Sequence, residues 1–255
     1  MENVKTAVTV IILTKNEEKN IQACIKSASF AKEIVVVDSG STDDTERLAV
    51  KAGARFVIHP MGGDGFAGQR NFALQEAREK WVFYLDADER ITPQVAEGIK
   101  SAVEKNEQCY YDVKRINVLF GQRMRGGGFG PDYSQRLYPK TAIKWHGVVH
   151  EHADCSLPLA HLYGHLEHYP YQSWDKYFEK FNRYTTMMAE KMYKNGKRAS
   201  FADMLLHPLG GFVRFYFFKQ GFREGKLGFI LAVNHYFYTM TKYVKLYYLD
   251  TKNES

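Results

Sequence analysis

Residues 81–89 decide the fold, and they read Trp81-Val82-Phe83-Tyr84-Leu85-Asp86-Ala87-Asp88-Glu89. The run at 81–85 is continuously apolar, which is typical of a strand buried on both faces. Similar runs occur at 9–13, 33–37 and 55–58, and helices are expected between the runs, ending near Phe30, Ala52 and Lys80, with another at about 93–106. Buried strands that alternate with helices predict an α/β fold with a mainly parallel sheet flanked by helices.

The pattern changes twice further along the chain. Residues 109–170 alternate short strands with loops, including a Gly-rich loop at 125–130, and residues 171–255 are helical. Breaks in the helical part are expected near Gly196, at 207–211 and at 225–228, where Gly or Pro occurs. We therefore divide the chain into 1–108, 109–170 and a C-terminal helical region at 171–255.

The composition indicates a globular protein of a reducing compartment. Of 255 residues, 45% are hydrophobic and 25% charged, which argues against disorder. Three cysteines without a Cys-x-x-Cys pair argue against a disulfide framework or a zinc–thiolate site. The N-terminus lacks the basic-then-apolar order of a signal peptide, so a cytoplasmic location is expected.

Positive charge is concentrated in the C-terminal region. Residues 171–255 hold 14 Lys and Arg against 7 Asp and Glu, an excess larger than the net charge of +6 for the whole chain. Basic and aromatic residues interleave at 214–219 and 242–248, which fits a helix lying on the anionic inner face of the cytoplasmic membrane or aromatic packing on the rest of the protein. The charge-free stretch 227–241 is too short to span a bilayer. A nucleic-acid partner is not expected, because no base-reading module is recognisable.

Polar side chains follow the first, second and fourth apolar runs. They are Thr14, Asn16 and Glu17; Asp38 and Ser39; and Asp86 and Asp88. Because ligands of parallel α/β sheets bind beyond the carboxyl ends of the strands, these groups are expected at one rim that forms a binding site.

Asp86 and Asp88 predict a metal site at this rim. Residues two apart in an extended chain project to the same side, so the two carboxylates converge. Adjacent anions repel unless a cation lies between them, and Mg²⁺ or Mn²⁺ held by carboxylates and substrate phosphates is the usual solution. The alternative is a solvated loop whose acids cap the following helix.

Two other enzyme classes compete with this interpretation. Gly63, Gly65 and Gly68 match the Gly-x-Gly-x-x-Gly fingerprint of NAD(P)-binding oxidoreductases, but they follow the third strand instead of the first. A nucleotidyltransferase could also use rim carboxylates, but it would need a Gly-rich, Lys-containing loop after the first strand, which carries Lys15, Asn16 and Glu17.

Four motifs together resemble the family-2 glycosyltransferases of the GT-A fold. The matching stretches are Val10–Glu17, Ile34–Asp43, Gly68-Gln69-Arg70-Asn71 and Asp86-Ala87-Asp88. The resemblance implies that residues 1–108 bind a UDP-sugar donor, that 109–170 carry the acceptor side of the same domain, and that the sugar is transferred with inversion. Position 15 is Lys where the commonest family pattern has Tyr, so an aromatic ring for stacking on uracil is missing there.

The resemblance also implies roles for individual residues. The donor-binding residues would be Thr14, Asn16, Glu17, Asp38, Ser39, Arg70 and Asp86. Asp88 would bind the metal with Asp86 nearby, and His165 or His168 could complete its shell or contact phosphate. A carboxylate must take the proton from the acceptor hydroxyl; Glu151, after the apolar Val148-Val149, is the first candidate and Asp132 the second.

The rest of the chain is similar to bacterial lipopolysaccharide-core glucosyltransferases that act on an inner-core heptose. The supporting stretches are 134–140, 145–151, 165–169 and 221–229. This narrower resemblance implies glucose as the sugar and a glycolipid as the acceptor. The alternative within the class is the same reaction on another lipid-linked or cell-wall glycan.

Overall fold

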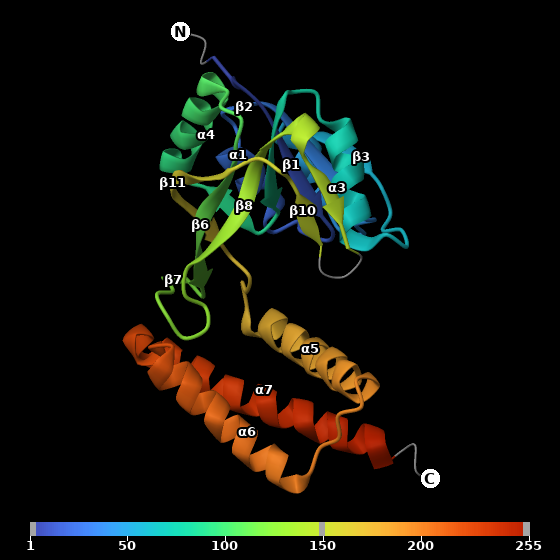
Figure 1. The fold of residues 1–255 in the computed structure, drawn as a ribbon, viewed down its shortest axis with the longest axis vertical. Coiled ribbons are helices and arrows are strands. Elements are labelled where there is room, and N and C mark those ends of the chain that lie inside the picture. Colours follow the sequence, from blue (N-terminus) through green and yellow to red (C-terminus); the bar gives the residue numbers. More distant parts are fainter. Residues whose placement is uncertain (1–3, 148–150, 252–255) are drawn as a thin grey trace. The chain divides into compact units, whose positions relative to one another are not determined.

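The computed structural model describes residues 4–147 and 151–251. The strands are β1 (Thr6–Thr14), β2 (Ala31–Asp38), β3 (Arg55–Ile58), β4 (Trp81–Asp86), β5 (Glu89–Ile91), β6 (Tyr110–Leu119), β7 (Gln122–Arg123), β8 (Asp132–Pro139), β9 (Lys144–His146), β10 (His152–Asp154) and β11 (Leu159–His168). The helices are α1 (Ile21–Ser27), α2 (Thr45–Lys51), α3 (Gly65–Glu76), α4 (Pro93–Lys105), α5 (Trp174–Lys194), α6 (Phe201–Val213) and α7 (Gly225–Thr251), as Figure 1 shows. Short turns of helix occur at η1 (Lys140–Ala142), η2 (Arg214–Phe218) and η3 (Gly221–Glu224).

The chain divides into two compact units. The first contains residues 1–116 and 132–168, and the second contains 117–131 and 169–255. The first unit is built on a mixed sheet whose strands follow the order β3-β2-β1-β4-β8-β6-β11-β5. Strands β3, β2, β1 and β4 are parallel, whereas β8 runs antiparallel to both β4 and β6. The predicted fold class is confirmed, with the parallel strands confined to one half of the sheet.

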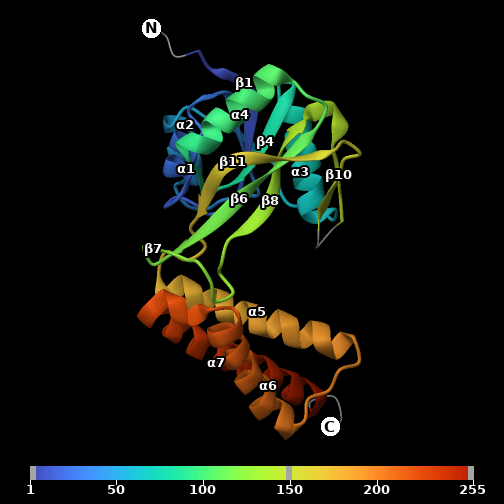
Figure 2. The same cartoon turned by 60° about the vertical axis from the view of Figure 1, so that its left-hand side comes forward.

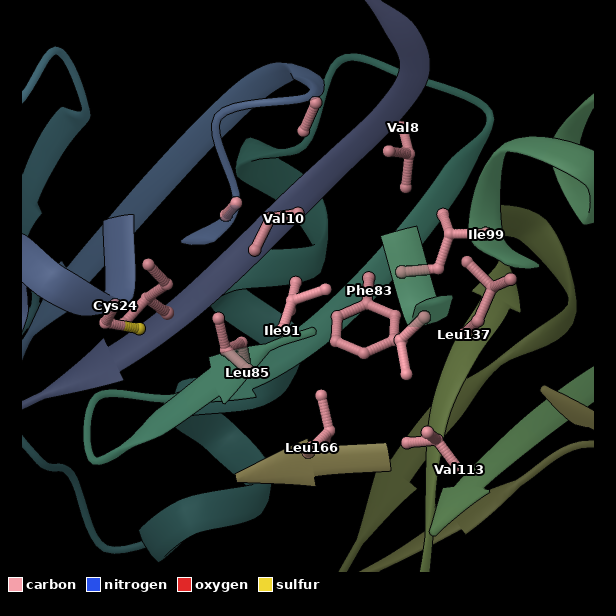
Figure 3. Packing of buried hydrophobic residues seen from close by; sticks show 14 of the residues in the cluster. Val8, Val10, Cys24, Phe83, Leu85, Ile91, Ile99, Val113, Leu137 and Leu166 are labelled. Carbon is pink, nitrogen blue, oxygen red and sulfur yellow. The ribbon is translucent and has the colours of Figure 1, made fainter. Parts of the chain in front are cut away.

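Both faces of the parallel strands are buried, as their continuous apolar runs predict. Val10 and Ile12 of β1 face a core that includes side chains of α1, α2 and α4, and Ile11 faces the opposite core, which includes side chains of α3. Figure 3 shows part of the first core, where Phe83 and Leu85 lie among residues from neighbouring strands and helices. Neighbouring residues of one strand therefore serve two separate cores.

The second unit contains α5, α6 and α7, and α7 packs against both other helices (Figure 2). Ser173 caps α5 by accepting a hydrogen bond from the Lys176 backbone N–H, and Ser200 and Asp203 form a capping box at α6. The break predicted at Gly196 is confirmed, since this residue has a left-handed φ of 78° after α5. No helix in the described residues is long and apolar enough to cross a membrane.

The break predicted at 207–211 is wrong, because α6 continues through Pro208 to Val213. Of the two glycines in this stretch, Gly211 serves close packing instead: a Cβ there would lie 3.3 Å from Thr239 Oγ1 of α7. The chain leaves helical geometry later, at Gln220, whose φ is 58°.

Candidate active site

The strand register brings the predicted rim residues into one row. Thr14 at the end of β1 pairs with Asp38 of β2, and its neighbour Leu13 pairs with Asp86 of β4. Because β1 lies between β2 and β4, Asp38 and Asp86 flank Thr14 at the same edge of the sheet. Ser39 joins this edge by donating its backbone N–H to the Thr14 carbonyl at 3.0 Å.

The loops that follow β1 and β2 are hydrogen-bonded to each other. Asn16, with a left-handed φ of 55°, donates its backbone N–H to Ser41 Oγ at 2.7 Å and accepts from the Thr42 N–H through Oδ1 at 2.8 Å. The Glu17 N–H donates to Thr45 Oγ1 at 2.8 Å. Asn16 and Glu17 thus fix the shape of the rim through their amide groups.

Asp38 accepts hydrogen bonds from the loop that follows it. It is 2% exposed, and Oδ2 accepts from the Gly40 and Ser41 N–H groups at 2.8 and 2.7 Å, while Oδ1 accepts from Ser41 Oγ. These bonds use three of the roughly four acceptor sites of a carboxylate. The loop geometry at the rim therefore depends on Asp38.

Arg70 of α3 enters the rim between two aromatic rings. Its guanidinium lies 5.3 Å from the Tyr84 ring centroid and 4.5 Å from that of Trp145. The adjacent Asn71 fixes the backbone of Trp145, donating to its carbonyl at 2.8 Å and accepting from its N–H at 2.9 Å. The Gln69-Arg70-Asn71 motif therefore ties α3 to β9.

The guanidinium of Arg70 faces two carboxylates that are far apart in the sequence. Its Nη2 lies 3.8 Å from Asp86 Oδ1 and 3.5 Å from Glu151 Oε1. Glu151 therefore lies at the same rim as Asp86. In the described residues, Arg70 Nε and Thr14 Oγ1 are buried without a hydrogen-bond partner. Buried polar groups normally have one, so these two atoms are candidates to bind a ligand.

Asp86 belongs to a buried charge network that the sequence did not predict. Arg136 of β8, 3% exposed, places Nη2 2.8 Å from Asp86 Oδ2 and 2.6 Å from Glu89 Oε1. Arg115 lies 3.3 Å from the same Glu89 oxygen. Burial would raise the pKa of Asp86, but Arg136 and Arg70 hold it well below its usual value. Burial raises the pKa of the fully enclosed Glu89, only partly offset by Arg136.

We expect Arg136→Met to destabilise the protein by about 3–5 kcal/mol, because the change leaves Asp86 and Glu89 without their shared cation in a buried site. Urea unfolding would measure this loss. Arg47→Met is the matched control, since Arg47 is 62% exposed and pairs with Asp44 at the surface, where such a pair contributes at most about 1 kcal/mol. Equal losses in the two variants would contradict the role given to Arg136.

Asp88 pairs with His168 at the end of β11. Asp88 Oδ2 lies 3.3 Å from His168 Nε2, and both side chains are largely buried. His165 is three residues away on the same strand, so its ring lies on the opposite face from His168, and its carbonyl accepts from Thr92 Oγ1 at 2.7 Å. The structure thus joins Asp88 to His168 and separates the two histidines.

Asp88 and His168 are suitable ligands for a divalent ion. Carboxylate oxygen and imidazole nitrogen both bind Mn²⁺, and Mg²⁺ is commonly held by one or two carboxylates together with substrate phosphates. Across the residues that the structure describes, no three or more His, Cys, Asp or Glu side chains gather into a metal-binding group. Asp88 and His168 alone would supply two ligands of the kind that such an ion accepts.

Asp132, the second candidate base, is held by an arginine. Arg115 Nε and Nη2 lie 3.0 and 2.6 Å from its two oxygens. Burial would raise the pKa of Asp132, but the bidentate bond to Arg115 lowers it below its usual value. A carboxylate held in this way is a weaker proton acceptor than one without such a partner.

Sequence reasoning missed two residues of the site, and the structure gives a physical reason why the glycine motif at 63–68 is not a dinucleotide site. No role was expected for Glu89 or Arg136. The position of Arg136 within the run 134–138 could have indicated one, because an arginine on a buried strand must have an acidic partner. The glycine motif at 63–68 does not present a bare helix N-terminus, because the Asp64 carboxylate lies against Gly68 in the first turn of α3. A pyrophosphate would meet that negative charge.

Comparison with known proteins identifies the family. The model of the family described as "Glycosyl transferase family 2" matches residues 9–157. The chain is 30% identical over 263 residues to the lipopolysaccharide core biosynthesis glycosyltransferase LpsC of Rhizobium meliloti, covering 95% of this chain and 93% of that protein. It is 27% identical to an uncharacterized glycosyltransferase of Rickettsia typhi, covering 97% of this chain and 89% of the relative.

Among solved structures, the chain is similar to glucosyl-3-phosphoglycerate synthase of Mycobacterium tuberculosis, crystallised with Mn²⁺, UDP and glucosyl-3-phosphoglycerate. The identity is 28% and the TM-score 0.37, covering 44% of each chain. The family match covers more than half of the sequence, and the relative LpsC is similar over nearly all of it. The chain therefore belongs to glycosyl transferase family 2 and is a glycosyltransferase.

Proposed function

We propose that the protein transfers a sugar, with glucose as the first candidate, from a UDP-sugar to an inner-core heptose of lipopolysaccharide. The observation that carries this proposal is the meeting of Asp86 and Glu151 at the guanidinium of Arg70, on the rim where Asp88 and His168 pair. The similarity to LpsC over nearly the whole chain supports lipopolysaccharide core as the acceptor class.

The donor would lie along the row formed by β2, β1 and β4. The residues that would border the nucleoside are Thr14, Asn16, Glu17, Asp38 and Ser39. The buried Thr14 Oγ1, which has no hydrogen-bond partner in the described part of the chain, could bind it. Arg70, whose Nε has no hydrogen-bond partner among the described residues, would contact the diphosphate, because guanidinium N–H groups form strong charge-assisted hydrogen bonds with phosphate oxygens. Asp86 would keep Arg70 in position through their contact.

Asp88 and His168 would hold Mg²⁺ or Mn²⁺, which would neutralise the charge that develops on the departing UDP. Glu151 would accept the proton of the acceptor hydroxyl as that oxygen attacks the anomeric carbon from the side opposite the leaving group, giving inversion in a single displacement. Arg70 Nη2 lies 3.5 Å from Glu151 Oε1 and would orient this carboxylate.

Donor identity can be tested by thermal unfolding with a panel of UDP-sugars, each with and without Mn²⁺. We expect UDP-glucose with Mn²⁺ to raise the melting temperature by about 5 °C or more at about 100 times its Kd, since ligand binding to the folded state alone stabilises it. UDP-galactose and UDP-N-acetylglucosamine serve as matched controls. A larger rise in melting temperature with either control would indicate that sugar nucleotide, and not UDP-glucose, as the donor. No rise with any UDP-sugar would contradict the proposal.

We also propose that the second unit binds the anionic surface of the membrane that holds the acceptor. Its exposed apolar side chains include Phe201, Leu205, Leu206 and Leu209 of α6 and Phe217, Phe218 and Phe222 just after it. The four α6 residues follow a helical period and share one face. Contiguous apolar surface flanked by Lys and Arg is typical of an interfacial helix.

We expect Leu206→Asp/Phe218→Asp to abolish co-sedimentation with vesicles containing anionic lipid, because both side chains are among the most exposed apolar groups of this unit, at 68% and 80%. Binding of the unaltered protein should weaken as salt is raised from 0.1 to 1 M, where the Debye length falls from about 10 to about 3 Å. Val50→Asp, at an exposed apolar position of α2, is the control. Equal sedimentation of both variants would refute membrane binding by this surface.

A further inference from the structure

A cavity of about 430 Å³ lies within the second unit, and the proposed reaction does not use it. Residues of α5, η2, α7 and the Gly-rich loop line it, and its volume lies in the range of about 300–1,000 Å³ typical of small-molecule sites. Helices α5 and α7 lie side by side in both views (Figures 1 and 2).

The walls of the cavity are rich in tyrosine. Tyr171, Tyr177, Tyr184 and Tyr238 line it together with three phenylalanines. Burial raises the pKa of Tyr171, Tyr177 and Tyr238, so their phenols stay protonated and can donate. No hydroxyl of these four tyrosines forms a hydrogen bond within the described parts of the chain. Aromatic rings that carry free hydroxyls suit a polyol better than an acyl chain, because they offer both a flat surface and hydrogen bonds.

Two cations stand at the same cavity, and neither has an acidic partner among residues 4–147 and 151–251. Arg214 and Lys219 both line it, and no Asp or Glu is among its lining residues. The Lys219 N–H donates to the Arg214 carbonyl at 2.8 Å, an i to i+5 bond that closes a π-helical turn. Single π turns are rare and are frequent at functional sites. Burial lowers the pKa of His235, which also lines the cavity, and the charges of Lys219, Lys242 and Arg214 lower it further.

The π turn is held rigidly by the Gly-rich loop. Phe215, 5% exposed, packs on Gly127 and Gly128, where a Cβ would lie 2.9 and 3.0 Å from its ring. The Gly127 N–H donates to the Lys219 carbonyl at 2.8 Å. Both glycines have left-handed φ angles, 66° and 75°, which a larger residue would strain. The loop therefore fixes the backbone between the two cations.

We propose that this cavity binds a phosphorylated saccharide, with the sugar against the tyrosines and the phosphate between Arg214 and Lys219. This is a second binding site, separate from the donor rim in the other unit. Arg214 and Lys219 favour a phosphate group, because both cations can form charge-assisted hydrogen bonds with its oxygens. The four tyrosine hydroxyls favour a sugar, because they can exchange hydrogen bonds with its hydroxyl groups. A phospholipid headgroup shares the phosphate but not the polyol.

Titration calorimetry with glucose 6-phosphate, without donor or divalent ion, tests the proposal. We expect glucose 6-phosphate to bind saturably. Glucose and inorganic phosphate should each bind with about tenfold lower affinity, since each lacks one half of the ligand. Dihexanoyl phosphatidic acid should also bind more weakly. Tighter binding of phosphatidic acid or equal binding of inorganic phosphate would overturn the saccharide assignment, and no binding of glucose 6-phosphate would overturn the site.

Two sets of variants locate the binding. Arg214→Gln/Lys219→Gln should weaken the binding of glucose 6-phosphate by about tenfold or more. The control Arg223→Gln/Lys226→Gln changes exposed side chains outside the cavity and should bind glucose 6-phosphate as the unaltered protein does. Tyr171→Phe/Tyr238→Phe removes two hydroxyls while keeping both rings and the charge, and it should weaken the binding of glucose 6-phosphate severalfold. Unchanged binding in both cavity variants would overturn the proposal. Asp88→Ala should retain the binding, so failure of the proposed transfer reaction would leave this result unaffected.

Discussion

Asp88→Ala is expected to reduce transfer from the UDP-sugar by about a thousandfold or more. The side chain would supply the only carboxylate proposed to bind the ion directly, and a divalent ion contributes several kcal/mol to stabilising the leaving diphosphate, where each 1.36 kcal/mol changes the rate about tenfold. The change should leave the melting temperature nearly unaltered, because the contact it removes is the 3.3 Å approach of one carboxylate oxygen to His168 Nε2, while the ion pairs of Arg136 with Asp86 and Glu89 remain.

Initial rates of UDP release over a range of Mn²⁺ concentrations would measure the effect. Asp175→Asn is the control, because Asp175 is an exposed carboxylate in the first turn of α5 and has no role in the proposed reaction. Asp88→Asn should show partial activity that requires more Mn²⁺, since an amide oxygen is a weaker ligand. Full activity of Asp88→Ala would remove Asp88 from the metal site.

Glu151→Gln is expected to lower kcat by about 10²–10⁴-fold, the usual contribution of a general base, with little change in donor binding. Glutamine keeps an oxygen that can face Arg70 at the same place but cannot accept the proton. The expected signature is a normal thermal shift with UDP-sugar together with a collapsed rate. A rate that falls through loss of donor affinity alone would instead assign Glu151 to donor binding.

Asp132→Asn provides the matched comparison, because Asp132 was the second candidate base and is equally a carboxylate of the first unit. We expect a much smaller loss of kcat, since Arg115 binds both of its oxygens and lowers its pKa. If Asp132→Asn collapsed the rate while Glu151→Gln retained it, the proton acceptor would be Asp132.

The parallel half of the fold could be predicted because its signal is local. Val10, Ile11 and Ile12 are consecutive and all buried, which only a sheet covered on both faces requires. The same logic placed Asp38 and Asp86 at one edge, and their register with β1 confirms that placement. By contrast, Ser41 does not cap α2 as its spacing to Asp44 suggests, because its hydroxyl is bonded to Asp38 instead.

Contacts between distant strands could not be predicted in the same way. Arg136 meets Asp86 and Glu89 because β8 lies beside β4 in antiparallel register, and no sequence pattern specifies that neighbour. The meeting of Glu151 with Arg70 likewise joins residues 81 positions apart in the sequence, and no local pattern specifies it. Local periodicity specifies elements, whereas such pairs depend on tertiary packing.

The bonds between Asn71 and Trp145 have a consequence for how the sequence around Arg70 could drift during evolution. Asn71 contacts main-chain atoms of β9, so these bonds impose no chemical identity on Lys144 or His146, the two neighbours of the anchored tryptophan. Substitutions at those two positions would change the side chains that β9 carries while the anchor continues to hold α3 to β9. The strand can therefore diversify without releasing the helix that carries Arg70.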